Sequence, residues 1–330
     1  MLRKILSYSL VVGIVIITFN LISACSTQPA HKSNYEYTND MLFGNILLSH
    51  NSEIDSQSIP KIIHLSDIHI GSEACKVNYE NCEREFENVC DILIKWSRIN
   101  NGKEYVIMIT GDIVDKSLPN DNYNNMRKAR LLINELDKHF RKVLIIPGNH
   151  DLKTTREENI SQVSLNKFKE IFYGADEVSK EYPKLDIIGN VAFIGLNSLE
   201  GAIGKTYSDY YGDLNCGSKQ LQALEKLIEN RSPFNLNEKK IVLYFHHPLE
   251  CSSDNAPHQQ RFVKKIKSYI LENKVAAILT GHTHDITDKN IEWDGVLEHN
   301  AGTTTGKKRN QRSNIRILDL ENKNIKEIEL

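Results

Sequence analysis

The sequence predicts an α/β fold. From Lys61 onward, short runs rich in Ile and Val alternate with stretches in which apolar residues recur every three or four positions, and this alternation is typical of α/β domains. The apolar runs are nearly continuous, as in strands that are buried on both faces of a sheet. Five runs end directly in clusters of Asp, His, Asn or Gly. Because α/β sheets bind ligands outside the carboxyl ends of their strands, these clusters predict one shared site.

Eight segments are predicted to be strands because each is a short apolar run bounded by polar or turn-forming residues. In chain order they are 61–67, 104–112, 142–149, 190–198, 239–247, 274–282 and, with weaker patterns, 295–302 and 314–320. Five segments are predicted to be helices because their apolar residues recur at helical spacing. They are 78–98, 124–140, 161–172, 218–230 and 259–272. In the fourth, one face consists of Leu221, Leu224, Leu227 and Ile228.

Residues 1–24 are predicted to be an export signal. Arg3 and Lys4 precede an apolar stretch, and small residues precede Cys25, which is the order found in signal peptides. The segment LISAC resembles the lipobox of bacterial lipoproteins, and this resemblance implies a lipid on Cys25, with Ser26 favouring the outer membrane of a Gram-negative cell. The alternative is an uncleaved anchor, because residues 5–22 nearly reach the ~20 residues that span a bilayer. Both alternatives place the remaining chain outside the cytoplasm.

The rest of the chain divides into a tether and a domain. Residues 25–59 are mostly polar and predict a flexible tether, in which an apolar patch near residues 41–48 docks on the domain. Residues 60–330 form the predicted domain. The 41 Lys and Arg residues against 43 Asp and Glu residues give a net charge of −2. Nucleic acid is therefore not the expected partner, since proteins that bind its backbone usually carry a broad basic excess.

Five cysteines follow Cys25, and an odd number cannot all pair within the chain. They are Cys75, Cys82, Cys90, Cys216 and Cys251. There are two alternatives for these cysteines. The first three could contain one disulfide, as an oxidising compartment would permit. Otherwise the cysteines are buried as reduced, apolar side chains.

The strand ends carry a set of potential metal ligands. In chain order, SDIH contains Asp67 and His69, GDIVD contains Asp112 and Asp115, GNHD contains Asn149 and His150, FHHP contains His246 and His247, and GHTH contains His282 and His284. Taken singly, each could be a helix cap, a turn or a buried histidine. Five such clusters, each after an apolar strand, indicate a metal site, because imidazole and carboxylate groups are common ligands of divalent cations.

The order D-x-H, GD-x-x-D, GNH[D/E], H and GH-x-H resembles that of the calcineurin-like metallophosphoesterase superfamily, from about Lys61 to about Leu320. The resemblance implies a four-layer α/β/β/α sandwich, in which two sheets lie between outer helices. The segment GDLNCGSKQLQALEKLI is also similar to the segment between the third and fourth motifs of the class III cyclic-nucleotide phosphodiesterase branch. We therefore expect the chain to be closest to this branch.

The resemblance also implies two divalent metal ions. By motif position, Asp67, His69, Asp112 and His284 would hold one ion, and Asp112, Asn149, His246 and His282 would hold the other. Asp112 would bridge them, because a carboxylate has two oxygens and the ions of such pairs lie roughly 3.5–4 Å apart. The mixture of carboxylate, amide and imidazole ligands suits Mn, Fe or Zn. The sequence leaves the pair open.

The implied reaction is hydrolysis of a phosphoester by a hydroxide that bridges the two metals, since metal binding can lower the pKa of water to about 7. His150 would protonate the leaving oxygen or stabilise the transition state, and Asp115 would orient His150. His247 would either contact the phosphate or pack away from the site. The segment NAGTTTG, residues 300–306, would either line the pocket with backbone donors or form a plain turn.

The expected substrate is a phosphodiester. Protein Ser/Thr phosphatases of the superfamily carry an arginine after GD-x-x-D, whereas this chain has Lys116, which cannot make the bidentate phosphate contact of arginine. The GNHD and HHP motifs fit the phosphodiesterase branch better. Three alternatives stay open: a phosphomonoesterase, a nuclease of the same superfamily, and a surface lipoprotein that binds a partner and uses the metals only for stability. The natural substrate and the oligomeric state are also open.

Overall fold

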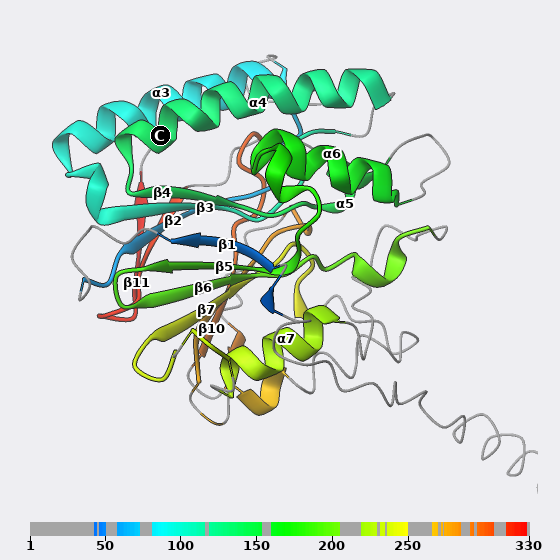
Figure 1. Ribbon diagram of the computed structural model, residues 1–330. Coiled ribbons are helices and arrows are strands. Elements are labelled where there is room, and N and C mark those ends of the chain that lie inside the picture. Colours follow the sequence, from blue (N-terminus) through cyan, green and yellow to red (C-terminus); the bar gives the residue numbers. More distant parts are fainter. Residues whose placement is uncertain are drawn as a thin grey trace, which may run out of the picture. The chain divides into compact units, whose positions relative to one another are not determined.

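Figure 1 shows the computed structural model of the chain. The structure describes residues 43–44, 46–50, 58–72, 81–115, 119–153, 160–204, 219–229, 232–234, 236–249, 266–269, 272, 274–284, 291–293, 296–306 and 315–328. All of them belong to the second of two compact units, Met1–Glu36 and Tyr37–Leu330. The predicted export signal, Cys25 and most of the tether lie outside the described residues, as do Cys75, Lys116, Cys216 and Cys251. No helix within the described ranges has the length and apolarity to cross a bilayer.

Two sheets form the centre of the fold (Figure 1). The first contains, in spatial order, β12 (Asn324–Ile328), β11 (Ile315–Asp319), β2 (Lys61–Leu65), β3 (Tyr105–Ile109) and β4 (Lys142–Ile145). The second contains β1 (Ile46–His50), β5 (Glu181–Ile188), β6 (Val191–Gly195), β7 (Lys240–Tyr244), β8 (Val275–Thr280), β10 (Val296–Asn300) and β9 (Ile291–Trp293). Strands β2, β3 and β4 are mutually parallel, as are β6, β7, β8 and β10.

Helices cover the outer face of each sheet. On the side of the first sheet lie α3 (Cys82–Ile99), α4 (Pro119–His139) and α6 (Gln162–Phe172), and on the side of the second lies α7 (Lys219–Ile228) (Figure 1). The short helices are η1 (Gly102–Glu104), α5 (Asn149–Leu152), η2 (Ala175–Glu177) and η3 (Glu200–Ala202). The layers therefore follow the order helix, sheet, sheet, helix, and the predicted α/β/β/α sandwich is confirmed.

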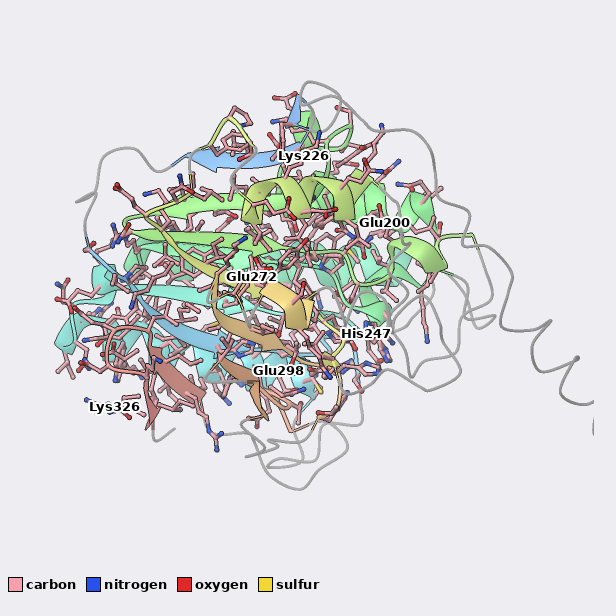
Figure 2. The ribbon with its side chains drawn as sticks, turned by 90° about the horizontal axis from the view of Figure 1, so that it is seen from below. Glu200, Lys226, His247, Glu272, Glu298 and Lys326 are labelled. Carbon is pink, nitrogen blue, oxygen red and sulfur yellow. The ribbon has the colours of Figure 1, made fainter. Side chains whose placement is uncertain are left out.

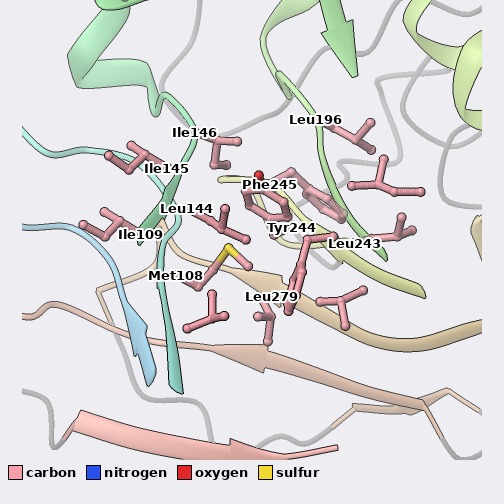
Figure 3. Packing of buried hydrophobic residues seen from close by; sticks show 14 of the residues in the cluster. Met108, Ile109, Leu144, Ile145, Ile146, Leu196, Leu243, Tyr244, Phe245 and Leu279 are labelled. Atoms are coloured by element: carbon pink, nitrogen blue, oxygen red, sulfur yellow. The ribbon is translucent and has the colours of Figure 1, made fainter. Parts of the chain in front are cut away.

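The space between the sheets is filled by apolar side chains. Every residue of β3 and of β6 is buried, which is why their sequences read as continuous apolar runs. In Figure 3, Met108 and Leu144 of the first sheet lie among Leu243, Tyr244 and Leu279 of the second. Each such side chain contributes roughly 1.5–3 kcal/mol on burial. This packing fixes the strands, and with them the starting points of the loops that follow.

All eight predicted strands are confirmed, and so are the first four predicted helices. Of the predicted helix 259–272 the structure describes only residues 266–269, which are helical, and residue 272. Strands β1, β5, β9 and β12 were not predicted from the sequence. Strand β5 was hidden by its charged residues and Pro183, although the two-residue connection Gly189–Asn190 to its antiparallel neighbour β6 is a recognised hairpin pattern.

Strand β1 corrects the predicted boundary at residue 60. Residues 46–50 were assigned to the tether, but they pair in parallel with β5. Phe43, Ile46 and Leu47 are buried in the apolar core. The apolar patch near residues 41–48 therefore packs on the domain because it supplies both an edge strand and core side chains, and the domain begins before residue 60.

Cys82 and Cys90 are buried in α3 and form no disulfide with each other. The eight residue steps from Cys82 to Cys90 along the helix correspond to about 12 Å, which exceeds the roughly 7 Å limit for the Cα atoms of a disulfide. Burial raises the pKa of the Cys90 thiol. For this pair, the structure supports the alternative of reduced, apolar side chains.

Candidate metal centre

The carboxyl ends of the parallel strands bring the predicted site residues together. Asp67 and His69 follow β2, Asp112 and Asp115 follow β3, Asn149 and His150 follow β4, His246 and His247 follow β7, and His282 and His284 follow β8. The first three strands belong to one sheet and the last two to the other. Distances of a few ångströms join residues of the two sets, so the site spans the sheets at one shared edge, as the position of ligand sites in α/β folds predicts.

One group of ligand atoms is formed by Asp67, His69, Asp112 and His284, whose atoms all lie within 4.8 Å of one another. The Oδ1 atom of Asp67 lies 3.3 Å from Nε2 of His284 and 3.7 Å from Nε2 of His69. These two ring nitrogens are 3.2 Å apart. Among the described residues, Asp67 Oδ1 accepts no hydrogen bond although it is buried. A cation between these atoms would satisfy the carboxylate, so the residues fit a metal ion.

A second group surrounds His246. Its Nε2 lies 3.0 Å from Oδ1 of Asn149 and 3.3 Å from Oδ2 of Asp112, and its ring centroid is 5.1 Å from that of His282. The Nδ1 atom of His246 donates to the carbonyl of Thr110 at 2.7 Å. This contact leaves Nε2 as the nitrogen that faces the site, as in metal-ligating histidines whose other nitrogen is held by a carbonyl.

Five of the predicted ligands have left-handed backbone. The φ angles are 52° at Asp67, 54° at His69, 51° at Asp112, 74° at His282 and 58° at His284. In this region a residue with a Cβ atom costs about 1–2 kcal/mol relative to ordinary backbone. Such strain persists only where surrounding contacts hold it, and it is typical of functional sites.

The glycines that precede ligands allow the loops to approach each other closely. Gly111 has a φ of 93°, and a Cβ atom there would lie 2.5 Å from the backbone nitrogen of Gly148. A Cβ atom on Gly281 would lie 1.9 Å from Oγ of Ser66 and 2.7 Å from Oδ2 of Asp67. Only glycine fits these two positions, which explains the GD and GH patterns in the sequence.

His150 and Asp115 form a pair beside the first group. Oδ1 of Asp115 lies 2.9 Å from Nδ1 of His150, and Nε2 of His150 lies 3.9 Å from Oδ2 of Asp112. The His150 ring also packs edge-on against His69 at 4.7 Å. The carboxylate thus holds the ring so that its Nε2 atom faces Asp112. The structure thus brings these two predicted site residues together.

The charges of the site depend strongly on one another. Burial opposes the charge on Asp112, but His246 and His150 outweigh it and hold the pKa of this carboxyl well below its usual range. Burial alone would lower the pKa of His246, yet Asp112 raises it to about 9. Burial together with the charge of His246 lowers the pKa of His282 to about 3. Because histidine binds metals only when neutral, metal binding at His246 would release a proton.

His247, labelled in Figure 2, packs against two of the predicted ligands, His246 and His282. Its ring centroid is 4.3 Å from that of His282, and its Nδ1 lies 2.8 Å from Oγ of Ser198. Burial, followed by the charges of His282 and His246, lowers the pKa of His247 well below its ordinary value. Ser198 was not predicted as a site residue, although it follows strand β6 as the predicted ligands follow their strands.

Asp151 was also missed, because the sequence analysis assigned roles only to its neighbours in GNHD. Its Oδ1 accepts hydrogen bonds from the backbone nitrogens of Ile113 and Val114 at 3.0 and 3.1 Å, and its Oδ2 accepts one from Gly148 at 2.8 Å. This buried carboxylate therefore joins the loop after β3 to the loop after β4. Burial and the charge of Asp112 raise the pKa of Asp151 to about 7.

A sequence match decides the family. Residues 60–285 match the family described as calcineurin-like phosphoesterase, which is more than half of the 330-residue chain. The chain belongs to the calcineurin-like phosphoesterase family. This calcineurin-like phosphoesterase is therefore a hydrolase that acts on phosphoester bonds, and its Asp and His groups are compatible with a dinuclear site for divalent metals.

Several solved structures share a low similarity with this calcineurin-like phosphoesterase. A dimetal phosphatase from Danio rerio is 15% identical over 79% of this chain and 92% of its own, with a TM-score of 0.48. The calcineurin-like phosphoesterase YfkN from Bacillus subtilis is 11% identical over 75% of this chain and 82% of its own, with a TM-score of 0.40. A putative 5′-nucleotidase from Staphylococcus aureus is 12% identical over 81% of this chain and 52% of its own, with a TM-score of 0.43. No curated protein matches the chain.

Proposed function

We propose that this phosphoesterase hydrolyses phosphodiesters with the help of two divalent cations. The observation that carries the proposal is the position of Asp112, whose Oδ2 lies 3.8 Å from Nε2 of His69 in one ligand group and 3.3 Å from Nε2 of His246 in the other. One cation would be held by Asp67, His69, Asp112 and His284, and the other by Asp112, Asn149, His246 and His282. When bound, such cations lower the pKa of water and neutralise charge on phosphate oxygens.

His150 would act on the leaving oxygen. Asp115 accepts the Nδ1–H of this histidine at 2.9 Å, so the proton available for transfer is the one on Nε2. A carboxylate partner stabilises the protonated imidazole, which can then donate to the oxygen that leaves phosphorus. Asp115 is the positioning residue in this scheme, since it acts through His150.

Two features support a diester over a monoester. Lys116 stands where the protein phosphatases have an arginine, and lysine lacks the fork that grips a phosphate with two parallel hydrogen bonds. The GNHD and HHP motifs fit the phosphodiesterase branch.

We also propose that the enzyme is exported, because residues 1–25 have the order of a lipoprotein signal. The enzyme would be anchored by a lipid on Cys25 and would act on phosphodiesters of the cell envelope. Metabolic labelling with a fatty-acid analogue is expected to mark the wild-type chain and not Cys25→Ala. A wild-type chain without label would exclude the lipid and favour the uncleaved anchor.

The reaction is tested with a matched pair of chromogenic esters, bis(p-nitrophenyl) phosphate and p-nitrophenyl phosphate. The full-length chain is assayed with Mn, Fe or Zn and with a chelator. We expect the diester to be hydrolysed at least about tenfold faster than the monoester, a difference of about 1.4 kcal/mol in the barrier, and the chelator to abolish both activities. A preference for the monoester would indicate a phosphatase, degradation of DNA a nuclease, and metal binding without turnover a binding protein.

A further inference from the structure

Residues 298–305, the end of β10 and the loop after it, contact the loops of three ligand motifs. Oε1 of Glu298 accepts a hydrogen bond from the backbone nitrogen of Leu249 at 2.9 Å, in the loop that follows His246. Nδ2 of Asn300 donates to the carbonyl of Gly281 at 2.6 Å, directly before His282. The third contact is with the loop of Asp67. This 298–305 segment lies beyond the part of the chain that matches the family, residues 60–285.

Three consecutive threonines hold three consecutive carbonyls of the Asp67 loop. Their Oγ1 atoms donate as follows: Thr303 to Asp67 at 3.0 Å, Thr304 to Ser66 at 2.8 Å and Thr305 to Ile68 at 2.8 Å. The Oγ1 of Thr304 also accepts from the backbone nitrogen of Ser66 at 3.0 Å. All three threonines are buried, so these hydrogen bonds do not compete with bulk water. Loss of the Thr304 hydroxyl would also deprive the buried backbone nitrogen of Ser66 of its acceptor.

These hydrogen bonds act on strained backbone. Asp67 and His69 have φ angles of 52° and 54°, and relaxation to ordinary backbone would turn the Asp67 carboxylate and the His69 ring away from His284. The threonine contacts at the carbonyls of residues 66–68 oppose that relaxation. They therefore hold two ligands of the first metal in place before any ion binds, which is the way that outer contacts raise metal affinity.

The 298–305 segment also reaches the second ligand group. Nδ1 of His299 lies 2.7 Å from Nδ1 of His64, and Nε2 of His64 lies 3.0 Å from Oγ1 of Thr110. The carbonyl of Thr110 accepts from Nδ1 of His246. A continuous line of buried contacts thus runs from β10 in one sheet through β2 and the end of β3 in the other to His246.

Three backbone nitrogens of the 298–305 segment donate hydrogen bonds within the protein. The nitrogen of Ala301 donates to the carbonyl of Thr280 at 3.2 Å, that of Gly302 to Oδ1 of Asn300 at 2.9 Å, and that of Thr304 to the carbonyl of Ser66 at 2.9 Å. The expected alternative that this loop lines the pocket with backbone donors is wrong for these three groups, because each is already engaged within the protein.

We infer that residues 298–305 position the ligand loops of the metal centre, with Thr303 and Thr304 as the positioning residues of the first metal. The inference rests on the proposed two-metal site. In this role the 298–305 segment supplies no metal ligand itself and acts through the backbone of the Asp67 loop.

The test is the affinity of the metal-free, full-length chain for Mn²⁺, measured by equilibrium dialysis without substrate. Thr304→Val removes the hydroxyl group with both of its hydrogen bonds while nearly keeping the shape of the side chain. Loss of such outer contacts typically weakens metal binding about 10- to 100-fold, and we expect a loss in this range. Thr304→Ser keeps the hydroxyl group and is expected to bind Mn²⁺ as wild type does.

Thr280→Val is the matched control. Thr280 is fully buried at the end of β8 and directly precedes Gly281, but its Oγ1 has no hydrogen-bond partner among the described residues. We expect this variant to bind Mn²⁺ as tightly as wild type. If Thr304→Val does not fold by circular dichroism, Thr303→Val, which loses a single hydrogen bond, takes its place in the comparison.

The possible results separate the two proposals. If the wild-type chain binds Mn²⁺ and the Thr304 and Thr280 variants bind it equally well, the positioning role is overturned and the metal centre stands. If the wild-type chain binds no Mn²⁺, the metal centre is overturned and the positioning role with it. A selective loss in Thr304→Val that Thr304→Ser does not show supports both.

Discussion

Asp112→Asn is expected to lower metal-dependent hydrolysis of bis(p-nitrophenyl) phosphate about 10³-fold or more, which corresponds to about 4 kcal/mol in the barrier. Asp112 is the residue whose carboxylate faces both ligand groups, with His69 on one side and His246 on the other. Asparagine keeps an oxygen that can accept the backbone N–H of His150, a contact that Oδ1 makes at 2.8 Å in the wild type. Asparagine removes the negative charge that would face two cations. The loss of activity therefore measures the effect of this charge and not a change in the conformation of the loop.

The matched control for this change is Asp91→Asn, since Asp91 is exposed on α3 and far from the ligand motifs in the sequence. It is expected to retain wild-type activity. Metal content measured on the same preparations should fall for Asp112→Asn alone. If Asp112→Asn keeps more than about a tenth of the wild-type rate, the activation barrier has risen by less than about 1.4 kcal/mol. In that case the two-metal arrangement around Asp112 is wrong.

His150→Ala is expected to lower turnover about 10²- to 10⁴-fold, the range found for general acid catalysis, while Mn²⁺ binding is retained. The side chain of His150 is 10% exposed, so a substrate can reach it, and it is not among the proposed ligands. The loss should be larger for diesters with poor leaving groups than for p-nitrophenyl esters. A poor leaving group needs protonation as it departs, whereas p-nitrophenolate leaves without it.

Two further variants complete this experiment. Asp115→Asn keeps His150 but removes the carboxylate 2.9 Å from its Nδ1, and we expect a smaller loss with the same dependence on the leaving group. His139→Ala, at the surface end of α4, is the matched histidine control and should retain full activity. Unchanged turnover in His150→Ala would exclude this residue from catalysis, and an equal loss for all leaving groups would exclude its role as proton donor.

The strands and the ligand candidates could be predicted because each leaves a local pattern. Strand β3 is an apolar run that ends in GDIVD, and β8 is an apolar run that ends in GHTH. A strand buried on both faces must be apolar throughout, and ligands at its end must be polar and preceded by a glycine where two loops meet closely. The sequence by itself therefore determined the fold class and the candidate ligands that follow the strands.

Only the tertiary structure revealed what holds those residues in place. Thr304 and Ser66 are 238 positions apart in the chain, and Ser198 and His247 are 49 apart. Strand β1 belongs to the sheet through its pairing with β5, which is itself rich in charged residues. A hydrogen bond between distant residues imposes no spacing or periodicity on the sequence around either partner, because its geometry is set by how the sheets pack. For that reason the ligands of this centre can be identified along the chain, whereas the contacts that position them appear only when it is folded.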